Sequence, residues 1–576
     1  MTNGERTVSR PGLGELFRSA GVRVLHGLAR SDVAIAGVTD DSRGVAPGVC
    51  FVAVRGIAHD GHEFLRAAVN AGAAAVVVDQ SAWDQVHPSR YAGVAAVCVQ
   101  DSREALAKLA AAWYGLRGAG DAASMRLVGI TGTNGKTTTA WLLRSILRAA
   151  GRRVALLGTI EYDLISARLP APMTTPAPVA LCRHLKTAAD AGADDAVLEV
   201  SSHALAQRRC DGLEFSVGVF TNLSGDHLDY HRDVDAYAAA KRRLFDGLSA
   251  GATAVVNLDD PNGTQMVSGC NARSLTYAVD DAALDAAAHG HATGAANRWA
   301  PRAARAGVRA RMVEVGPHGT RFVLRGAAYE TPVRCRLVGL HNVYNALAAA
   351  AAAEAMGIDA GAIRAGIEQL RGVPGRLQRV EPDGHPFRVV VDYAHTDDAL
   401  DNVLRVLRPV TTRRLLCVFG CGGDRDRSKR PRMAAAVERA ADVAYVTSDN
   451  PRGEDPTAII DDVLTGFPAR SKCRIAVEVD RRAAIDAAIA EARPGDTVLI
   501  AGKGHETYQL LGDDVLDFDD VAAARRALDA ARGTVPGGAD GDQHGGACGD
   551  VGGDERGDAP GEAAPARSCV ETGGVV

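Results

Sequence analysis

A glycine- and threonine-rich loop, set between an apolar strand pattern and a helical pattern, is the clearest chemical feature of the sequence. The segment VGITGTNGKTTT spans residues 128–139 and precedes the helical run TAWLLRSILRAAG. Such a loop binds phosphate through backbone N–H groups and the helix N-terminus. Ile130 stands where the common G-x-x-x-x-G-K-[ST] pattern has its first glycine, which argues against a standard GTPase or kinase. The nucleotide-binding candidates are Gly132, Thr133, Asn134, Gly135, Lys136, Thr137 and Thr138.

Two other polar segments, LEVSSH and FTNLSGDHLDYH, follow predicted strands. Glu199 could join the Thr137 hydroxyl as a magnesium ligand, and His227 with Asp226 could position another metal or the substrate. The i, i+4 spacing of His227 and His231 is compatible with zinc, but no H-E-x-x-H motif or cysteine partner supports that reading. We therefore expect His231 to be a surface histidine. Taken alone, Lys241 in AYAAAKRRLF predicts only a solvated helix lysine.

Composition limits the class of protein. A chain of 576 residues exceeds the size of one hydrophobic core, so two to four domains are expected. The formal net charge of −5 and the lack of a Lys/Arg run give no reason to expect a nucleic-acid partner. The first residues lack the apolar core of a signal peptide, and no stretch is long enough to span a bilayer. With 11 cysteines that lack C-x-x-C spacing, the sequence predicts a cytoplasmic protein with reduced thiols and no membrane insertion.

Short β-branched runs alternate with Ala/Leu/Arg-rich helical stretches, a pattern typical of an α/β fold with mainly parallel sheets. Nearly every predicted strand ends in polar or glycine-rich residues, where open α/β sheets bind their ligands. Residues from 533 onward contain too few large apolar residues to form a core, so we expect a disordered, dispensable tail. The expected units are a small N-terminal α/β domain (1–124), a central P-loop ATPase-like domain (125–372), a Rossmann-like C-terminal domain (373–532) and the tail (533–576).

A series of motifs in fixed order resembles the Mur ligase family, the ATP-dependent amide-forming enzymes of bacterial peptidoglycan synthesis. The resemblance covers Val38 to about Leu528. It implies that the phosphate loop uses Gly132 and Gly135 and does not need glycine at Ile130. The motifs are TGTNGKTTT, EVSSHALAQRR, TNLSGDHLDYH, YAAAKRRLF, GLHNVYNALAA, VPGR, VDYAHT, GCGGDRDRSKRP, SDNPR and GKGHE.

Within the family, this combination implies the enzyme that adds the third peptide residue, and we expect it to be a monomer. ATP would phosphorylate the D-glutamate side chain of UDP-N-acetylmuramoyl-L-alanyl-D-glutamate, and the amine of meso-diaminopimelate would displace phosphate. By resemblance, Lys136 acts on the transferred phosphate, and Thr137 and Glu199 hold one Mg²⁺. His227 and a carbamylated Lys241 hold a second Mg²⁺. A lysine that reacts with CO2 becomes an anion, which a nearby cation favours.

The resemblance also implies positions for both nucleotides. Ser42 of DSR and His59 match the uridine-binding region, and Arg376, just after the expected hinge, would help ATP close the C-terminal domain. The ATP contacts expected outside the loop are Asn342, Arg376 and Asp392. The muramoyl dipeptide would contact Thr174, Thr175, Ser201, Gln207 and Arg209.

The SDNPR and GKGHE segments bear on the amino acid that is added. Diaminopimelate differs from lysine by a distal carboxylate, which the planar, two-pronged guanidinium of Arg452 would suit. Glu506 would hold the adjacent ammonium. The alternative is that Arg452 forms an ordinary surface ion pair. By resemblance, the pocket is completed by Arg425, Asp449, Asn450, Pro451 and Gly502.

Two departures from the family pattern concern local loop geometry. Asp397 replaces the usual proline of HTPDAL, and His341 stands where an aromatic residue often precedes the asparagine. No role is assigned to the Ala/Arg-rich insert near 285–311.

Three alternatives to this function are the same ligase with L-lysine as the added amino acid, a folylpolyglutamate-type ligase, and a non-catalytic UDP-sugar-binding scaffold. The DNPR and GKGHE pair disfavours the second, and two metal clusters disfavour the third.

Overall fold

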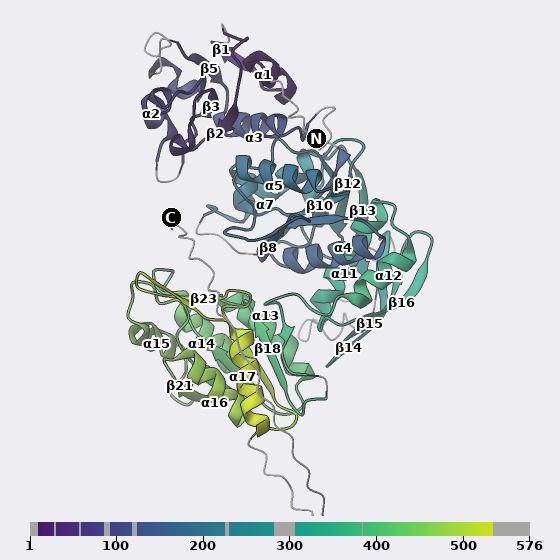
Figure 1. The fold of residues 1–576 in the computed structure, drawn as a ribbon. Helices are drawn as coiled ribbons and strands as arrows, with labels where there is room; N and C mark the ends of the chain where they lie inside the picture. Colours follow the sequence, from purple (N-terminus) through teal and green to yellow (C-terminus); the bar gives the residue numbers. More distant parts are fainter. Residues whose placement is uncertain are drawn as a thin grey trace, which may run out of the picture.

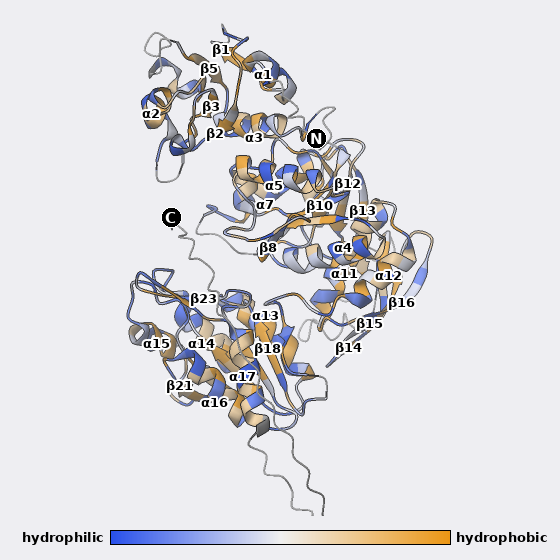
Figure 2. Ribbon diagram, viewed as in Figure 1, coloured by the Kyte–Doolittle hydropathy of each residue, from blue (hydrophilic) through white to orange (hydrophobic). Residues whose placement is uncertain are grey.

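The computed structural model describes residues 10–27, 30–56, 59–85, 93–117, 124–224, 230–280, 306–382 and 384–533. Three α/β units follow one another along the chain, each built around its own sheet (Figure 1). The sheets are apolar, with hydrophilic residues on the outer helix faces and loops (Figure 2). The expected tail beyond 533 and most of the 285–311 insert lie outside the described residues. The predicted α/β fold class is confirmed.

The N-terminal sheet has the order β1-β5-β4-β3-β2. Only β1 runs antiparallel to its neighbour. Asp101 caps the long helix α3, since its carboxylate accepts from the amides of Arg103 and Glu104. The strands are β1 (Val24–His26), β2 (Gly37–Thr39), β3 (Val49–Val52), β4 (Ala75–Asp79) and β5 (Ala95–Val99). The helices are α1 (Leu13–Ala20), α2 (Leu65–Asn70) and α3 (Ser102–Trp113), with short 3-10 turns at Ser42–Gly44, Gly61–Phe64 and Gln80–Gln85.

The central sheet has the order β16-β15-β14-β13-β12-β11-β6-β10-β7-β8-β9 and is parallel from β14 to β7. Antiparallel strands extend it at both ends. The strands are β6 (Arg126–Thr131), β7 (Val154–Leu157), β8 (Glu161–Asp163), β9 (Arg168–Pro170), β10 (Asp195–Glu199), β11 (Phe215–Phe220), β12 (Thr253–Asn257), β13 (Arg273–Val279), β14 (Val308–Gly316), β15 (Gly319–Arg325) and β16 (Glu330–Cys335). The helices are α4 (Lys136–Ala149), α5 (Pro178–Asp190), α6 (Ser202–Ala206), α7 (Val234–Asp246), α8 (Gly263–Met266), α11 (Leu340–Ala355) and α12 (Ala360–Gln369).

Small side chains let the central helices approach the sheet and one another. The alanines at 348–353 of α11 are fully buried in one core with α4 and strands β6, β10 and β11. At the contact of α12 with α4, a Cβ on Gly366 would lie 2.6 Å from the Ile146 backbone nitrogen, so only glycine fits there. A second core, to which helices α5 and α7 contribute, also contains Ala110 and Ala111 of α3. The N-terminal helix α3 therefore shares a hydrophobic core with the central domain.

The C-terminal sheet has the order β17-β18-β22-β19-β20-β21, and all but β17 are parallel. A mainly parallel sheet of this kind agrees with the Rossmann-like C-terminal domain expected from the sequence. The strands are β17 (Gln378–Arg379), β18 (Arg388–Asp392), β19 (Leu415–Phe419), β20 (Val443–Val446), β21 (Arg474–Val477) and β22 (Thr497–Ala501), with a separate hairpin of β23 (Tyr508–Leu511) and β24 (Asp514–Asp517). The helices are α13 (Asp397–Leu407), the 3-10 turn Arg408–Val410, α14 (Lys429–Ala440), α15 (Pro456–Leu464), α16 (Arg481–Glu491) and α17 (Asp520–Gly533).

A buried ion pair holds the ends of two C-terminal strands together. Arg481, at the start of α16, is 1% exposed and donates through Nη2 to Asp520 Oδ2 (2.7 Å). The same guanidinium donates to the carbonyls of Ala501 (3.0 Å) and Ser448 (3.4 Å). Those carbonyls directly precede Gly502 and Asp449. Arg481 therefore fixes both segments that were predicted to bind the amino acid.

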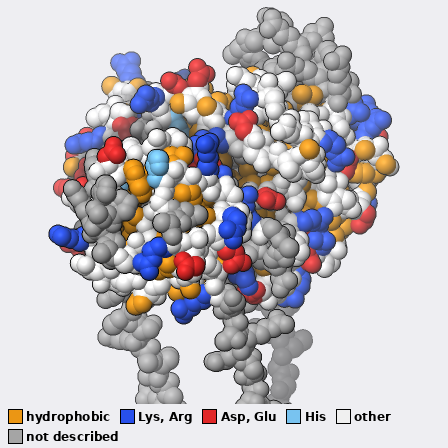
Figure 3. Space-filling model, turned by 90° about the horizontal axis from the view of Figure 1, so that it is seen from above, with side chains coloured by type: hydrophobic (Ala, Val, Ile, Leu, Met, Phe, Trp, Pro, Cys, Tyr) orange, Lys and Arg blue, Asp and Glu red, His pale blue; other side chains and the backbone are white. Residues whose placement is uncertain are grey.

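Charged side chains of both signs are interspersed on the surface seen from above the N-terminal domain (Figure 3). None of the described helices is long and apolar enough to cross a membrane.

We predict that Arg481→Met destabilises the C-terminal domain by about 3–5 kcal/mol, because Asp520 would keep a buried, unpaired charge. The free energy of unfolding is measured by chemical denaturation, with the loss of secondary structure followed by far-UV circular dichroism. An Arg481→Met/Asp520→Leu double variant removes both charges and should recover part of that loss. Equal stability of the Arg481→Met single variant and the unmodified protein would contradict this role.

Candidate functional site

The phosphate loop joins β6 to α4, as its sequence predicted. Gly135 precedes α4 with φ +88°, and Gly132 has φ +151°. A Cβ on Gly132 would overlap Thr221 Oγ1, so the loop requires glycine there. Lys136 Nζ donates to the carbonyls of Gly132 and Thr133, both at 2.8 Å. The Lys136 side chain is therefore held against the backbone of the loop that was predicted to bind phosphate.

Ile130 shows why this loop departs from the common motif. Its side chain is fully buried in the central core, and it pairs in register with Glu199 of β10 and Val219 of β11. The residue is therefore the interior of strand β6 and not part of the phosphate-binding turn. A glycine at this position would remove core contacts without freeing the loop.

The carboxylate of Glu199, 1% exposed, is bound by three donors from two segments. Thr137 Oγ1 donates to Oε2 (2.8 Å), Thr159 Oγ1 donates to Oε2 (3.0 Å) and the Thr159 amide donates to Oε1 (2.9 Å). Oxygen ligands of this kind suit Mg²⁺. The pair of Thr137 and Glu199 therefore fits the metal position that the sequence predicted for them.

Lys241 is not the solvated lysine that its helix alone suggested. It is 1% exposed, donates from Nζ to the carbonyl of Gly132 (2.9 Å) and lies 4.1 Å from the Tyr237 ring centroid. The expectation for His231 was also wrong, because it is 6% exposed and packs against Tyr237 and His203. His227 and Asp226 lie outside the described residues. Among the residues that the structure does describe, no three His, Cys, Asp or Glu side chains gather as a metal cluster.

Most residues predicted for the UDP-linked substrate gather beside Glu199. Thr175 Oγ1 donates to the Glu199 carbonyl (2.7 Å) and accepts from the Ser201 amide (3.1 Å). Arg209 Nη1 donates to the Thr175 carbonyl (2.7 Å), and its Nη2 donates to Gln207 Oε1 (2.7 Å). These residues form one connected network at the carboxyl end of β10.

Thr174 joins this network through Thr159, since their hydroxyl oxygens are 3.1 Å apart. Ser42 and His59 lie in the N-terminal domain, at the start of the Ser42–Gly44 turn and before the Gly61–Phe64 turn. The predicted substrate set is therefore divided between the first two domains.

The predicted ATP contacts outside the loop lie in two places. Asn342 is buried in the first turn of α11 and accepts from Asn345 Nδ2 (3.0 Å), while Asn345 Oδ1 lies against Gly135. Asp392 accepts from the Leu377 amide (2.6 Å), directly after Arg376, and burial raises the pKa of Asp392. The central and C-terminal domains thus each contribute part of this set.

The two departures from the family pattern occupy first helical turns. Asp397 is the first residue of α13 and follows the N-cap Thr396. A carboxylate is favourable there because the helix N-terminus carries partial positive charge. His341 lies in the first turn of α11.

Arg452 projects its guanidinium toward backbone carbonyls. Nη1 donates to Gly423 (2.9 Å) and Asn450 (3.5 Å), and the residue has φ +52°. Within the described ranges, no carboxylate lies at ion-pair distance from this guanidinium, so the surface ion-pair alternative is wrong. Pro451 supplies the carbonyl packed against Gly423. Arg425 is exposed in the preceding 421–428 loop.

Lys503 lies inside the predicted amino-acid pocket and was missed from the sequence. Its fully buried Nζ donates to Asn450 Oδ1 (2.8 Å) and lies 3.3 Å from Asp449 Oδ1 and 3.8 Å from Glu506 Oε2. Burial lowers the pKa of Lys503 and raises that of Glu506. A Cβ on Gly502 would lie 3.4 Å from Asp449 Oδ2. The pocket is therefore a compact set of opposite charges whose balance a bound zwitterion would change.

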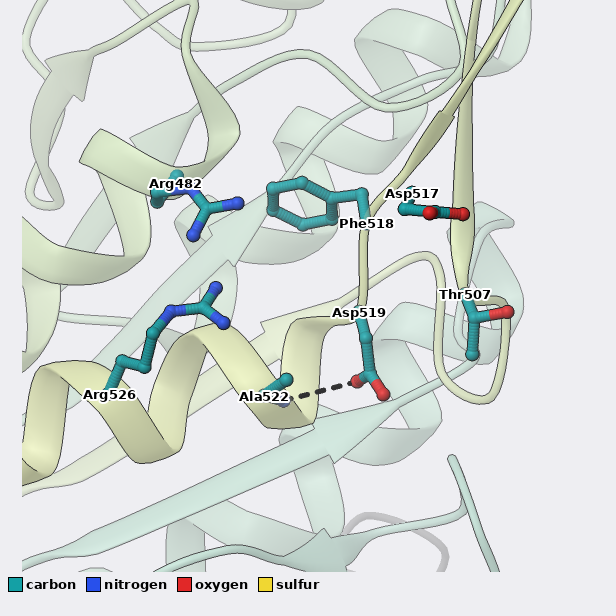
Figure 4. A pocket seen from close by; sticks show the side chains of 7 residues that line it. All are labelled: Arg482, Thr507, Asp517, Phe518, Asp519, Ala522 and Arg526. Atoms are coloured by element: carbon teal, nitrogen blue, oxygen red, sulfur yellow. Dashed lines mark hydrogen bonds between the residues drawn. The ribbon is translucent and has the colours of Figure 1, made fainter. Parts of the chain in front are cut away.

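A separate surface depression of about 310 Å³ lies beside α17 (Figure 4). Asp519 caps this helix, because its Oδ1 accepts from the Ala522 amide (3.2 Å). The depression contains none of the residues predicted for substrate or nucleotide. Its lining residues are Arg482, Thr507, Asp517, Phe518, Asp519, Ala522 and Arg526.

The fold is that of a three-unit α/β protein, in which a glycine-rich loop joins β6 to the N-terminus of α4 in the central unit. Family models agree with this class along the chain. The Mur ligase family catalytic domain matches residues 34–114, the Mur ligase middle domain matches 130–353, and the Mur ligase glutamate ligase domain matches 375–504. The chain belongs to the Mur ligase family, as its motifs predicted.

Similar proteins cover nearly the whole family region. A protein of Geobacter metallireducens is 44% identical over 521 residues, covering 86% of this chain and 94% of that protein. One of Solibacter usitatus is 43% identical over 503 residues, covering 87% and 94%. Both are named UDP-N-acetylmuramoyl-L-alanyl-D-glutamate–2,6-diaminopimelate ligase. A solved structure with that name aligns with TM-score 0.62 and 32% identity, covering 90% of this chain and 99% of the other.

Proposed function

We propose that this protein is an ATP-dependent ligase that joins meso-diaminopimelate to the D-glutamate of UDP-N-acetylmuramoyl-L-alanyl-D-glutamate in cytoplasmic peptidoglycan precursor synthesis. The observation that carries the proposal is the shared position of Glu199, which links the phosphate loop to the predicted dipeptide-binding residues. The names of the similar proteins support the same reaction. We further propose that the enzyme acts as a monomer.

Each domain has a part in this proposal. Residues 1–124 bind the uridine end of the substrate, residues 125–372 bind ATP and the dipeptide, and residues 373–532 bind the amino acid. A carboxylate is a poor electrophile, so the reaction proceeds through an acyl phosphate made from ATP. Lys136 and the N-terminus of α4 stabilise negative charge on the transferred phosphoryl group. The amine then attacks the acyl carbon, and inorganic phosphate leaves.

Magnesium neutralises phosphate charge when it is bound. Thr137 and Glu199 would hold one ion. An ammonium cannot be a ligand for a cation, so Lys241 fits the second position only as a carbamate, formed from its amine and CO2 with loss of a proton. His227 would complete that position. In the described structure, the buried Lys241 ammonium already touches the phosphate loop at Gly132.

Phosphate release from ATP tests the reaction directly. With Mg²⁺ and UDP-muramoyl dipeptide, we expect release that depends on both the dipeptide and diaminopimelate and that is far slower with lysine. A desolvated, unpaired Arg452 would disfavour lysine. Release without dipeptide dependence would remove the proposed function. If the enzyme used the two amino acids equally, it would still be a ligase that adds the third peptide residue, but it would not be selective for diaminopimelate.

For Lys241→Ala we predict a loss of turnover of at least about a hundredfold, with nearly unchanged binding of the UDP-linked substrate, because the missing group acts on phosphate and metal. Steady-state kinetics and calorimetry measure the two effects. Native mass spectrometry of the unmodified protein should show the added mass of one CO2 at this residue. Undiminished turnover of Lys241→Ala, without an added carboxylic acid, would exclude this role.

For Arg452→Ala we predict that the KM for diaminopimelate rises by at least about tenfold and that the preference over lysine narrows, because the distal carboxylate loses a two-pronged donor. The KM values for ATP and the UDP-linked substrate should stay within about twofold. Arg452→Lys keeps the charge without the planar fork and should recover only part of the preference. Arg470→Ala, at an exposed position, is the control. An unchanged preference in Arg452→Ala would disprove the assignment.

A further inference from the structure

The loop of residues 207–213, which follows α6, lies at the junction between the N-terminal and central domains. A Cβ on Gly212 would lie 2.7 Å from the carbonyl carbon of Ala107 and 2.9 Å from the Ala111 Cβ, both on α3. Cys210 and Leu213 share a buried core with Ala111. The loop backbone therefore rests directly on the N-terminal helix, with no space for a side chain at residue 212.

Arg208 joins the same two domains by charge. Its Nε lies 2.9 Å from Oδ2 of Asp101, the N-cap of α3, and its Nη1 lies 2.8 Å from Oε2 of Glu104 in the first turn of that helix. Nη1 also lies 2.9 Å from Asp211 Oδ2, which Arg243 of α7 approaches at 3.1 Å. The Arg208 side chain is 28% exposed, so water and salt screen its ion pairs less than they screen a fully exposed surface pair. One guanidinium thus connects three carboxylates across the domain boundary.

The backbone of Arg208 is in the left-handed region, with φ +58°. This conformation is unfavourable for a residue with a Cβ, so surrounding contacts must maintain it. Its neighbours face other partners: Gln207 donates to Tyr230 Oη (3.2 Å), and Arg209 donates to the Thr175 carbonyl (2.7 Å). In this turn, the Arg208 side chain therefore contacts the N-terminal domain, whereas the side chains of Gln207 and Arg209 contact the central domain, where the substrate residues were predicted.

We propose that Arg208 is a positioning residue that fixes the N-terminal domain against the dipeptide-binding loop. This inference rests on the proposed function, because the UDP-linked substrate would span Ser42 and His59 in one domain and Gln207 and Arg209 in the other. Arg208 sets the spacing between those two regions. The uridine end alone would not depend on this spacing, whereas the complete substrate would.

Kinetics of Arg208→Met test this role. We expect the KM for UDP-muramoyl dipeptide to rise by about tenfold, while kcat and the KM for ATP stay within about twofold. Arg208→Lys retains a cation and should recover part of the loss. The control is Arg242→Met, which removes an exposed pair with Asp246 on α7 and should have no effect. An unchanged KM in Arg208→Met, or an equal rise for ATP, would overturn the proposal.

Two binding measurements separate positioning from general damage. UDP alone should bind Arg208→Met as tightly as the unmodified protein, whereas the complete UDP-muramoyl dipeptide should bind about tenfold more weakly. In a double-mutant cycle, Glu104→Gln should cost less in the Arg208→Met background than in the unmodified protein. Weaker binding of UDP itself, or additive losses, would contradict a role in spacing.

Hydrogen exchange does not depend on the reaction. Amides of α3 and of residues 207–213 should exchange faster in Arg208→Met, while those of the C-terminal sheet keep their protection. Unchanged exchange in α3 would refute the inference even if the enzyme is active. An unmodified protein that does not use UDP-muramoyl dipeptide, combined with faster exchange in the variant, would instead refute the proposed function and leave the domain contact standing.

Discussion

The hydrogen bonds to the Glu199 carboxylate hold the central site together. A carboxyl group that is 1% exposed is costly to bury unless donors replace the lost water, and Thr137 and Thr159 supply those donors. The Glu199 backbone carbonyl accepts from Thr175 in the same place. Three segments that are distant in sequence are thereby placed around one strand end. The phosphate loop and the predicted dipeptide site depend on this one residue.

Charge compensation has a similar part in the C-terminal domain. The fully buried Lys503 lies among Asn450, Asp449 and Glu506, and Arg481 holds the preceding strand ends through carbonyls. Removing any one charge would leave its partners buried and uncompensated. This balance explains how Asp449 and Glu506 can lie close together in the part of the domain where an amino acid was predicted to bind.

The sequence predicted the α/β alternation and the polar strand ends that carry the site, because apolar runs and polar strand ends follow local rules. It did not predict β9, which is exposed along its length, or the two-residue β17. Such strands depend on pairing partners and not on their own apolar pattern. Thr159 was missed because a lone threonine after a strand has no distinctive spacing. The burial of Lys241 and His231 was also hidden, because tertiary contacts decide which face of a helix or loop is covered.

The two links between domains differ in their physical character. At the first link, Arg208, Gly212 and a shared core join α3 to the central domain. At the second, a Cβ on Gly375 would lie 2.5 Å from the Gly504 carbonyl carbon, so this glycine is packed within the C-terminal domain and moves with it.

Gly372, just before that contact, has open space around its Cβ position. Gly372 is therefore the less tightly packed of the two glycines, which suits the hinge expected just before Arg376. Arg376, whose guanidinium carbon lies 4.8 Å from the Tyr393 ring centroid, belongs to the C-terminal side of that pivot. A nucleotide bound to the phosphate loop and to Arg376 would join the domains across it, which gives the expected ATP-dependent closure a physical basis.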